Sequence, residues 1–211
     1  MVEGAAVAPL AALARPPEGL GALTHGVHAL RRPTVEEAAA ALDGPQTTRL
    51  VLTLAAWLEG GQWHAAAPAD RRAGLDAPMT AAAPAWLAGL HARMLKTAKT
   101  LDDAGRREKL RRRLRRLRTA VDFFRGLFAP GAVRAYAVRL DQAMAVLDAL
   151  HDADVARERL AYDRLNARPA RHARDAALRR LAQEDKRRHA ALPAAVKALR
   201  AVPVFWEPTP R

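Results

Sequence analysis

A regular stripe of apolar residues runs through the most basic part of this 211-residue chain. Between residues 106 and 118 the sequence RREKLRRRLRRLR holds nine basic residues and one acid. Apolar side chains recur here at steps of three and four, the spacing of one helix face: Leu110, Leu114, Leu117, Val121, Phe124 and Phe128. The pattern predicts a helix over residues 104–128 that buries this stripe and carries cations along both of its edges.

The arginines on one edge of this helix are the first candidate binding residues. Arg111 and Arg118 lie about 10 Å apart along a helix axis, so successive guanidinium groups suit successive phosphoryl groups of a linear polyanion. Few acids occur nearby in sequence to pair with them. The predicted anion site comprises Arg107, Arg111, Arg115 and Arg118, with Arg93, Lys96 and Lys99 from the preceding helix. The alternative is a solvated helix face in an Arg-rich chain.

Composition restricts the classes of function. The formal charge of +13 favours an anionic partner. The chain has neither Cys nor Ser, which excludes disulfides, thiolate zinc sites and serine nucleophiles. The longest apolar run, Leu50 to Leu58, is far shorter than the roughly 20 residues of a membrane span, and residues 1–20 do not resemble a signal peptide. We therefore expect a soluble, cytoplasmic protein.

Helical periodicity and helix breakers predict how the chain is organised. Residues 1–32 are punctuated by Gly and Pro and are predicted to form a flexible N-terminal arm, followed by a helical domain over 33–211. A capping box at Thr34 and Glu37 marks the first helix start, and residues 64–83 are predicted to be a linker. Further helices are predicted over residues 47–59, 84–101, 132–150, 152–165 and 172–200, the last kinked at Pro193. No strand period appears, so the fold class is all-α, an antiparallel helical bundle.

The order of the motifs resembles the CHAD domain (conserved histidine α-helical domain), mainly its second, C-terminal repeat. LRRRLRRLRTAVDFF (residues 110–124) is similar to the family's Arg-rich helix, and VLDALHDADVARERL (146–160) to its L-G-x-L-N-D-x-x-V-A-R segment. TRLVLTLAAWL, LHARMLKTAKTLDD and VPVFW also have counterparts, so the resemblance covers about residues 33–206. It implies about one half of a domain of two four-helix bundles, with a basic cleft that binds inorganic polyphosphate.

The chain departs from the family pattern in several places. Glu108 stands where the family has its histidine, Thr119 where Tyr is usual, and Asp148 where Gly allows close helix packing. Upstream of Pro33 there are too few residues for a first repeat. A weak twofold homodimer would supply the missing half of the cleft, and we expect polyphosphate to strengthen it.

These observations lead to one main hypothesis and two alternatives. The main hypothesis is a non-catalytic polyphosphate-binding protein, cytoplasmic and associated with polyphosphate granules, without catalytic residues, cofactor or metal. Asp148, His151, Asp152 and Asp154 are interpreted as capping residues at a helix end and not as metal ligands. The alternatives are a structural or interaction domain that has lost its ligand and a nonspecific nucleic-acid-binding module. Neither nucleic acid nor a membrane is the expected partner.

Overall fold

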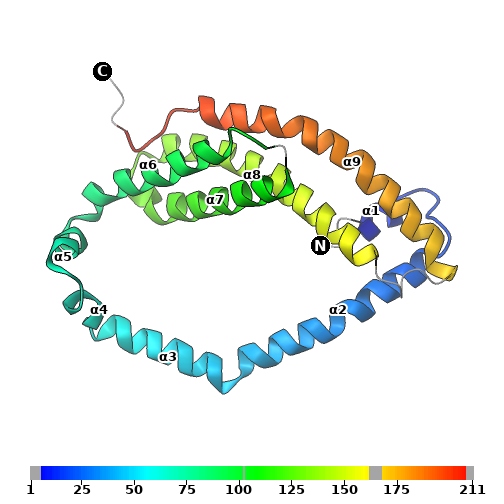
Figure 1. Cartoon of the computed structure of the whole chain (residues 1–211), viewed down its shortest axis with the longest axis horizontal. Coiled ribbons are helices and arrows are strands. Elements are labelled where there is room, and N and C mark those ends of the chain that lie inside the picture. The colour runs from blue at the N-terminus through cyan, green and yellow to red at the C-terminus, as the bar shows by residue number, and fades with distance from the viewer. Residues whose placement is uncertain (1–5, 102, 162–167, 208–211) are drawn as a thin grey trace.

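The computed structural model describes residues 6–101, 103–161 and 168–207. Across these residues it contains helices and no strand, which confirms the all-α prediction. The helices are α1 (Ala8–Ala11), α2 (Leu20–Asp43), α3 (Pro45–Glu59), α4 (Gln62–Ala65), α5 (Ala69–Asp76), α6 (Met79–Thr97), α7 (Ala104–Phe124), the 3₁₀ helix η2 (Arg125–Leu127), α8 (Pro130–Leu160) and α9 (Arg168–Ala201). Figure 1 shows a compact bundle of α6–α9 from which α2–α5 swing out as an open arc.

The main hydrophobic core lies within the bundle of α6–α9. It contains the predicted stripe of α7, whose residues from Leu110 to Phe124 are at most 4% exposed. Phe128, the last residue of the predicted stripe, is only partly buried and packs against the edge of this core. Tyr136 of α8 is fully buried among aromatic rings, and Trp206 closes the core just after α9. The Arg-rich helix is therefore held in place by burial of one narrow apolar face.

A second, smaller core lies at the other end of α8 and α9. Alanines such as Ala153, Ala156 and Ala173 are fully buried there, and their small side chains let the two long helices approach closely. Helix α8 spans 31 residues and α9 spans 34, about 47 and 51 Å at 1.5 Å per residue. These two helices join both cores into one body.

The N-terminal segment differs from the sequence prediction of a loose arm. Helix α2 begins at Leu20 and continues through Pro33 without a break. The predicted boundary between residues 32 and 33 therefore lies inside a helix, and the predicted capping box at Thr34 does not begin one. Residues just before α1, in α1 and in the first half of α2 are buried against α8 and α9: Ala6, Val7, Leu10, Leu23 and Val27. This segment is part of the folded body because its apolar residues share the second core.

The predicted breaks after residue 60 are also corrected. The predicted linker 64–83 contains the end of α4, all of α5 and the start of α6, which begins five residues before Pro84. Residues 132–150 and 152–160 belong to the single helix α8, whereas residues 162–165 of that prediction lie outside the described residues. Pro193 lies inside α9, which continues to Ala201. Packing of long helices on two shared cores outweighs the local cost of these prolines.

Candidate anion-binding surface

Helix α7 is the element that carries the candidate site. Asp103 caps its first turn by accepting a hydrogen bond from the backbone N–H of Arg106 at 2.7 Å. Because the leucine stripe is buried against α6 and α8, the cations at its two edges are directed toward these two neighbouring helices. One edge therefore borders α8, and the other borders α6.

The edge that borders α8 is paired with carboxylates. Arg111 binds Glu108 through two hydrogen bonds of 2.7 and 3.1 Å and reaches Asp148 of α8 at 3.2 Å. Arg115 binds the same Asp148 oxygen at 2.8 Å. Arg118 binds Asp141 of α8 at 2.6 Å, and it also pairs with Asp122 of its own helix. Each of these three predicted arginines already has an anionic partner within the chain.

These pairs also perturb the ionisation of their members. The hydrogen bond from Arg111 is the main reason why the pKa of Glu108 is lowered, and the same bond raises the pKa of Arg111. Hydrogen bonds to Asp141 and Asp122 raise the pKa of Arg118. The expectation that this edge lacks acids is therefore wrong, because two of the acids come from α8, more than twenty residues further along the chain.

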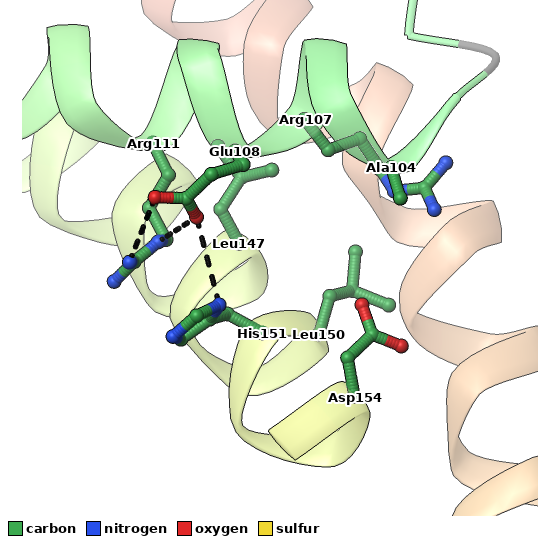
Figure 2. A pocket seen from close by; sticks show the side chains of 8 residues that line it. All are labelled: Ala104, Arg107, Glu108, Arg111, Leu147, Leu150, His151 and Asp154. Carbon is green, nitrogen blue, oxygen red and sulfur yellow. Dashed lines mark hydrogen bonds and ion pairs between the residues drawn. The ribbon is translucent and has the colours of Figure 1, made fainter. Parts of the chain in front are cut away.

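Glu108 lies at the centre of a small polar cavity between α7 and α8. Its carboxylate contacts Arg111 and lies 3.5 Å from Nδ1 of His151 on α8, as the dashed lines in Figure 2 show. Arg107 extends away from Arg111 along the rim of this cavity (Figure 2). The cavity measures about 30 Å³, room for a few water molecules.

The edge that borders α6 opens into a larger groove. The groove has a volume of about 450 Å³ and is lined by Arg93, Lys96, Thr97, Thr100, Arg106, Lys109 and Arg113. A second hollow of about 330 Å³ continues it along α7, lined by Lys109, Arg112, Arg113 and Arg116. We call the two hollows together the basic groove. Among the residues that the structure describes, no carboxylate lines either hollow, so this part of the surface is positive.

Contacts within the basic groove involve few acids. Arg106 pairs with Asp103 at 3.2 Å, and Arg112 lies 3.6 Å from Glu108. Arg113 donates to the backbone carbonyl of Arg93 and to Oγ1 of Thr97, which fixes its guanidinium across the groove. The hydroxyl of Thr97 donates to the backbone carbonyl of Arg93 at 3.1 Å, so the guanidinium and ammonium N–H groups are the suitable donors for phosphate oxygens.

The structure thus divides the predicted site residues between two surfaces. Arg93 and Lys96 line the basic groove, whereas Lys99 lies exposed just beyond α6 and outside both hollows. The predicted site omitted Lys109 and Arg113, although both lie on the same helix. A signal for them was present: α6 contains no Asp or Glu, whereas α8 contains five acids. The edge of α7 that packs against α6 therefore has fewer acidic partners available than the edge that packs against α8.

The acids predicted to cap a helix end do not do so. Asp148 and Asp154 lie within α8, which continues to Leu160, and they bind Arg115 and Arg157 at 2.8 and 2.7 Å. Across the described residues no three His, Asp or Glu side chains gather in a way that would hold a metal ion. In the same part of the chain no helix combines the length and apolar character that crossing a membrane requires.

Comparison with protein families gives the identity of the domain. The model of the CHAD domain family matches residues 2–161 and, in a second match, residues 107–204. The chain belongs to the CHAD domain family. CHAD domains are in general non-catalytic and bind inorganic polyphosphate. Searches among curated proteins and among solved structures gave no match.

The two matches correct the extent of the resemblance. The first begins at residue 2, and not near residue 33, in agreement with the packing of α1 and α2 onto the body. Both matches contain residues 107–161, which include most of α7 and all of α8. This helix pair is therefore the part of the chain that carries the family signal twice.

Proposed function

We propose that this CHAD protein is a non-catalytic binder of inorganic polyphosphate and that the polymer lies along the basic groove. The observation that carries the proposal is the absence of carboxylates among the described residues that line both hollows. A polyanion entering there meets the carboxylates of Asp103 and Glu108 only at the margin, where they pair with Arg106 and Arg112. We expect the protein to act in the cytoplasm, at polyphosphate granules.

The shape of the groove supports a linear ligand. Lys109 and Arg113 line both hollows, so the positive surface continues along α7 for several turns. A chain of phosphates could contact these cations in sequence and release its counterions, as nucleic acids do when they bind basic proteins. The ammonium groups of the lysines at the rim attract phosphate as point charges, and the guanidinium of Arg113, which is held in place, offers planar N–H donors to phosphate oxygens.

The edge of α7 that borders α8 remains a secondary contact in this proposal. Arg115 is the most accessible of its arginines, with a side chain 53% exposed, whereas Arg111 is 12% exposed. A polyphosphate that reaches this edge competes with Asp148 and Asp141 for the guanidinium groups. Its contribution to affinity should therefore be smaller than that of the basic groove.

A pair of charge-reversal variants tests the location. Lys96→Glu with Lys109→Glu reverses two exposed cations of the groove, and we expect it to weaken binding of long-chain polyphosphate by about tenfold or more. The matched control is Arg179→Glu with Arg187→Glu, which changes the net charge equally on an exposed part of α9. Equal loss in both variants would mean that net charge alone drives binding.

Competition between polymers tests the ligand. Long-chain polyphosphate and duplex DNA are compared at equal charge and equal ionic strength by fluorescence competition. We expect polyphosphate to bind more tightly. Equal affinity would indicate a nonspecific basic surface and would support the nucleic-acid alternative.

A larger effect of Arg115→Glu than of the double groove variant would move the site to the edge that borders α8.

A further inference from the structure

Residues 34–78 form a segment with unusually little burial, which we call the outer segment. It contains the second half of α2 and all of α3, α4 and α5, and it stands away from the bundle between its two attachment points (Figure 1). Within its described part no side chain is buried. Its attachment points are firm, because the start of α2 belongs to the second core and α6 belongs to the first.

Helix α3 of this segment exposes a wide apolar surface over most of its circumference. Its large apolar residues are between 47% and 67% exposed: Leu50, Val51, Leu52, Leu54, Trp57 and Leu58. Trp57 contacts only the similarly exposed ring of Trp63, at a centroid distance of 6.3 Å, among the ring contacts that the structure describes for it. Contiguous exposed apolar surface of this size marks an interaction site. The outer segment therefore requires a partner surface.

Charge indicates what that partner is. The outer segment holds six acids and three arginines, a formal charge of −3, and the whole chain carries +13, so the remaining residues carry +16. An acidic, apolar segment is repelled by anionic lipid and by nucleic acid, and it is attracted to a basic protein surface. The rest of this same chain is such a surface.

The body also offers an exposed apolar patch among its basic residues. Trp86 and Phe123 are 56% and 74% exposed, and both make edge contacts with Phe124, at centroid distances of 5.9 and 5.0 Å. Leu127 follows in η2 and is 41% exposed. Arg125 is exposed between Phe124 and Leu127. We call Trp86, Phe123 and Leu127 the aromatic patch.

We propose that two copies of this chain associate reciprocally, with α3 of each copy packed against the aromatic patch of the other. The twofold arrangement buries both apolar surfaces at once and places each acidic outer segment against a basic body. It leaves the basic groove outside the contact. The proposal does not rest on polyphosphate binding, and its tests are carried out without that polymer.

Cross-linking tests the arrangement directly, because the chain contains no Cys. Leu54→Cys and Phe123→Cys are prepared separately with tags of different size, mixed and oxidised. We expect a disulfide between the two variants to exceed the disulfides that each variant forms with itself. Predominant linkage of Leu54→Cys with itself would overturn the proposal in favour of contacts between outer segments. An intrachain disulfide in the double variant at high dilution would place α3 on its own body and would also overturn it.

Light scattering over a concentration series provides the second test. We expect the unmodified chain to be dimeric at high concentration, and Leu50→Glu with Leu54→Glu to shift it to monomer, with helicity by circular dichroism unchanged. Val138→Glu is the matched control, since Val138 is 47% exposed on α8 and lies outside the patch. A monomer at all concentrations would overturn the proposal, and co-sedimentation of that monomer with vesicles that is lost in the Leu50→Glu and Leu54→Glu variant would assign α3 to a lipid surface.

Discussion

Individual charged residues of this CHAD protein serve the fold as well as the ligand. Arg111 and Arg118 have the sequence positions of ligand-binding residues, yet in the structure they join α7 to α8 through Asp148 and Asp141. The exposed cations Lys96 and Lys109 are less prominent in sequence but line the groove. Under the proposed function, binding at the scale of residues therefore depends on cations that have no carboxylate partner among the described residues.

The first prediction concerns Asp148, which binds two arginines at once. Asp148→Asn keeps the side-chain shape and removes the charge that competes with a polyanion. We expect polyphosphate affinity to increase a few-fold, because exposed ion pairs contribute about 0.2–1 kcal/mol each. The measurement is titration against long-chain polyphosphate at fixed ionic strength. Asp154→Asn, which removes the same charge from α8 at a different ion pair, should change affinity less.

The second prediction concerns the pH dependence of stability. Burial lowers the pKa of His91, which packs edge-on against Tyr136 and Trp206. Below its unfolded pKa of 6.5 the unfolded chain takes up this proton more readily than the folded one, so stability falls as the pH drops from there toward the folded pKa. We expect the thermal midpoint of unfolding to decrease as the pH is lowered from about 7 to about 5. His91→Phe should reduce that decrease.

His189 provides the comparison for this experiment. Its pKa is also lowered, first by burial and then by Arg107, so it should contribute a further part of the same decrease. The variant His189→Gln separates the two contributions. A thermal midpoint of His91→Phe with the same pH dependence as the parent chain would show that burial of His91 does not control stability in this range.

At the scale of elements, the two long helices determine the architecture. Helices α8 and α9 pass through both cores. An ion pair between Arg157 of α8 and Asp185 of α9 joins them, and Asp185 is only 9% exposed. Arg157 belongs to the V-A-R motif of the family resemblance. The structure gives this motif arginine a role in helix pairing.

The third prediction tests that ion pair against an exposed one on the same arginine. Asp185→Ala removes the buried partner and should lower the free energy of unfolding by about 2 kcal/mol, less than a fully buried pair because Arg157 is partly exposed. Asp154→Ala removes the exposed partner, 2.7 Å from Arg157, and should cost less than about 0.5 kcal/mol. Urea denaturation of both variants provides the measurement. Equal losses would contradict the assignment.

At the scale of the whole molecule, charge is distributed unevenly along the chain. The body carries a large positive charge, and the outer segment carries a small negative one. This charge attracts a polyanion to the body from a distance, and under the proposed function the basic groove then orients the bound polymer. Such long-range attraction depends strongly on ionic strength.

The fourth prediction is the salt dependence of binding. The logarithm of the affinity for polyphosphate should decrease linearly with the logarithm of the salt concentration. Replacing Lys96 and Lys109 by Gln should reduce the slope by about 2, since each phosphate-contacting cation contributes about 1. Replacing Arg179 and Arg187 by Gln should leave the slope nearly unchanged. An unchanged slope in the groove variant would show that these lysines do not contact the polymer.

The sequence by itself determined the helical class, the buried face of α7 and the family. The helical class and the buried face follow from local periodicity, since a residue three or four positions away on a helix is always a spatial neighbour. The family follows from the resemblance of the motifs and their order. Leu110, Leu114 and Leu117 are buried as their spacing predicts.

Only the tertiary structure decided which edge of α7 is accessible to an anion. That choice depends on Asp141 and Asp148 of α8, which lie opposite the arginines because of how two helices pack. The tertiary structure also showed that α2 continues through Pro33 and that, in the described part of the chain, α3 has no buried side chain. Helix pairing joins residues far apart in sequence, and no local pattern specifies that pairing.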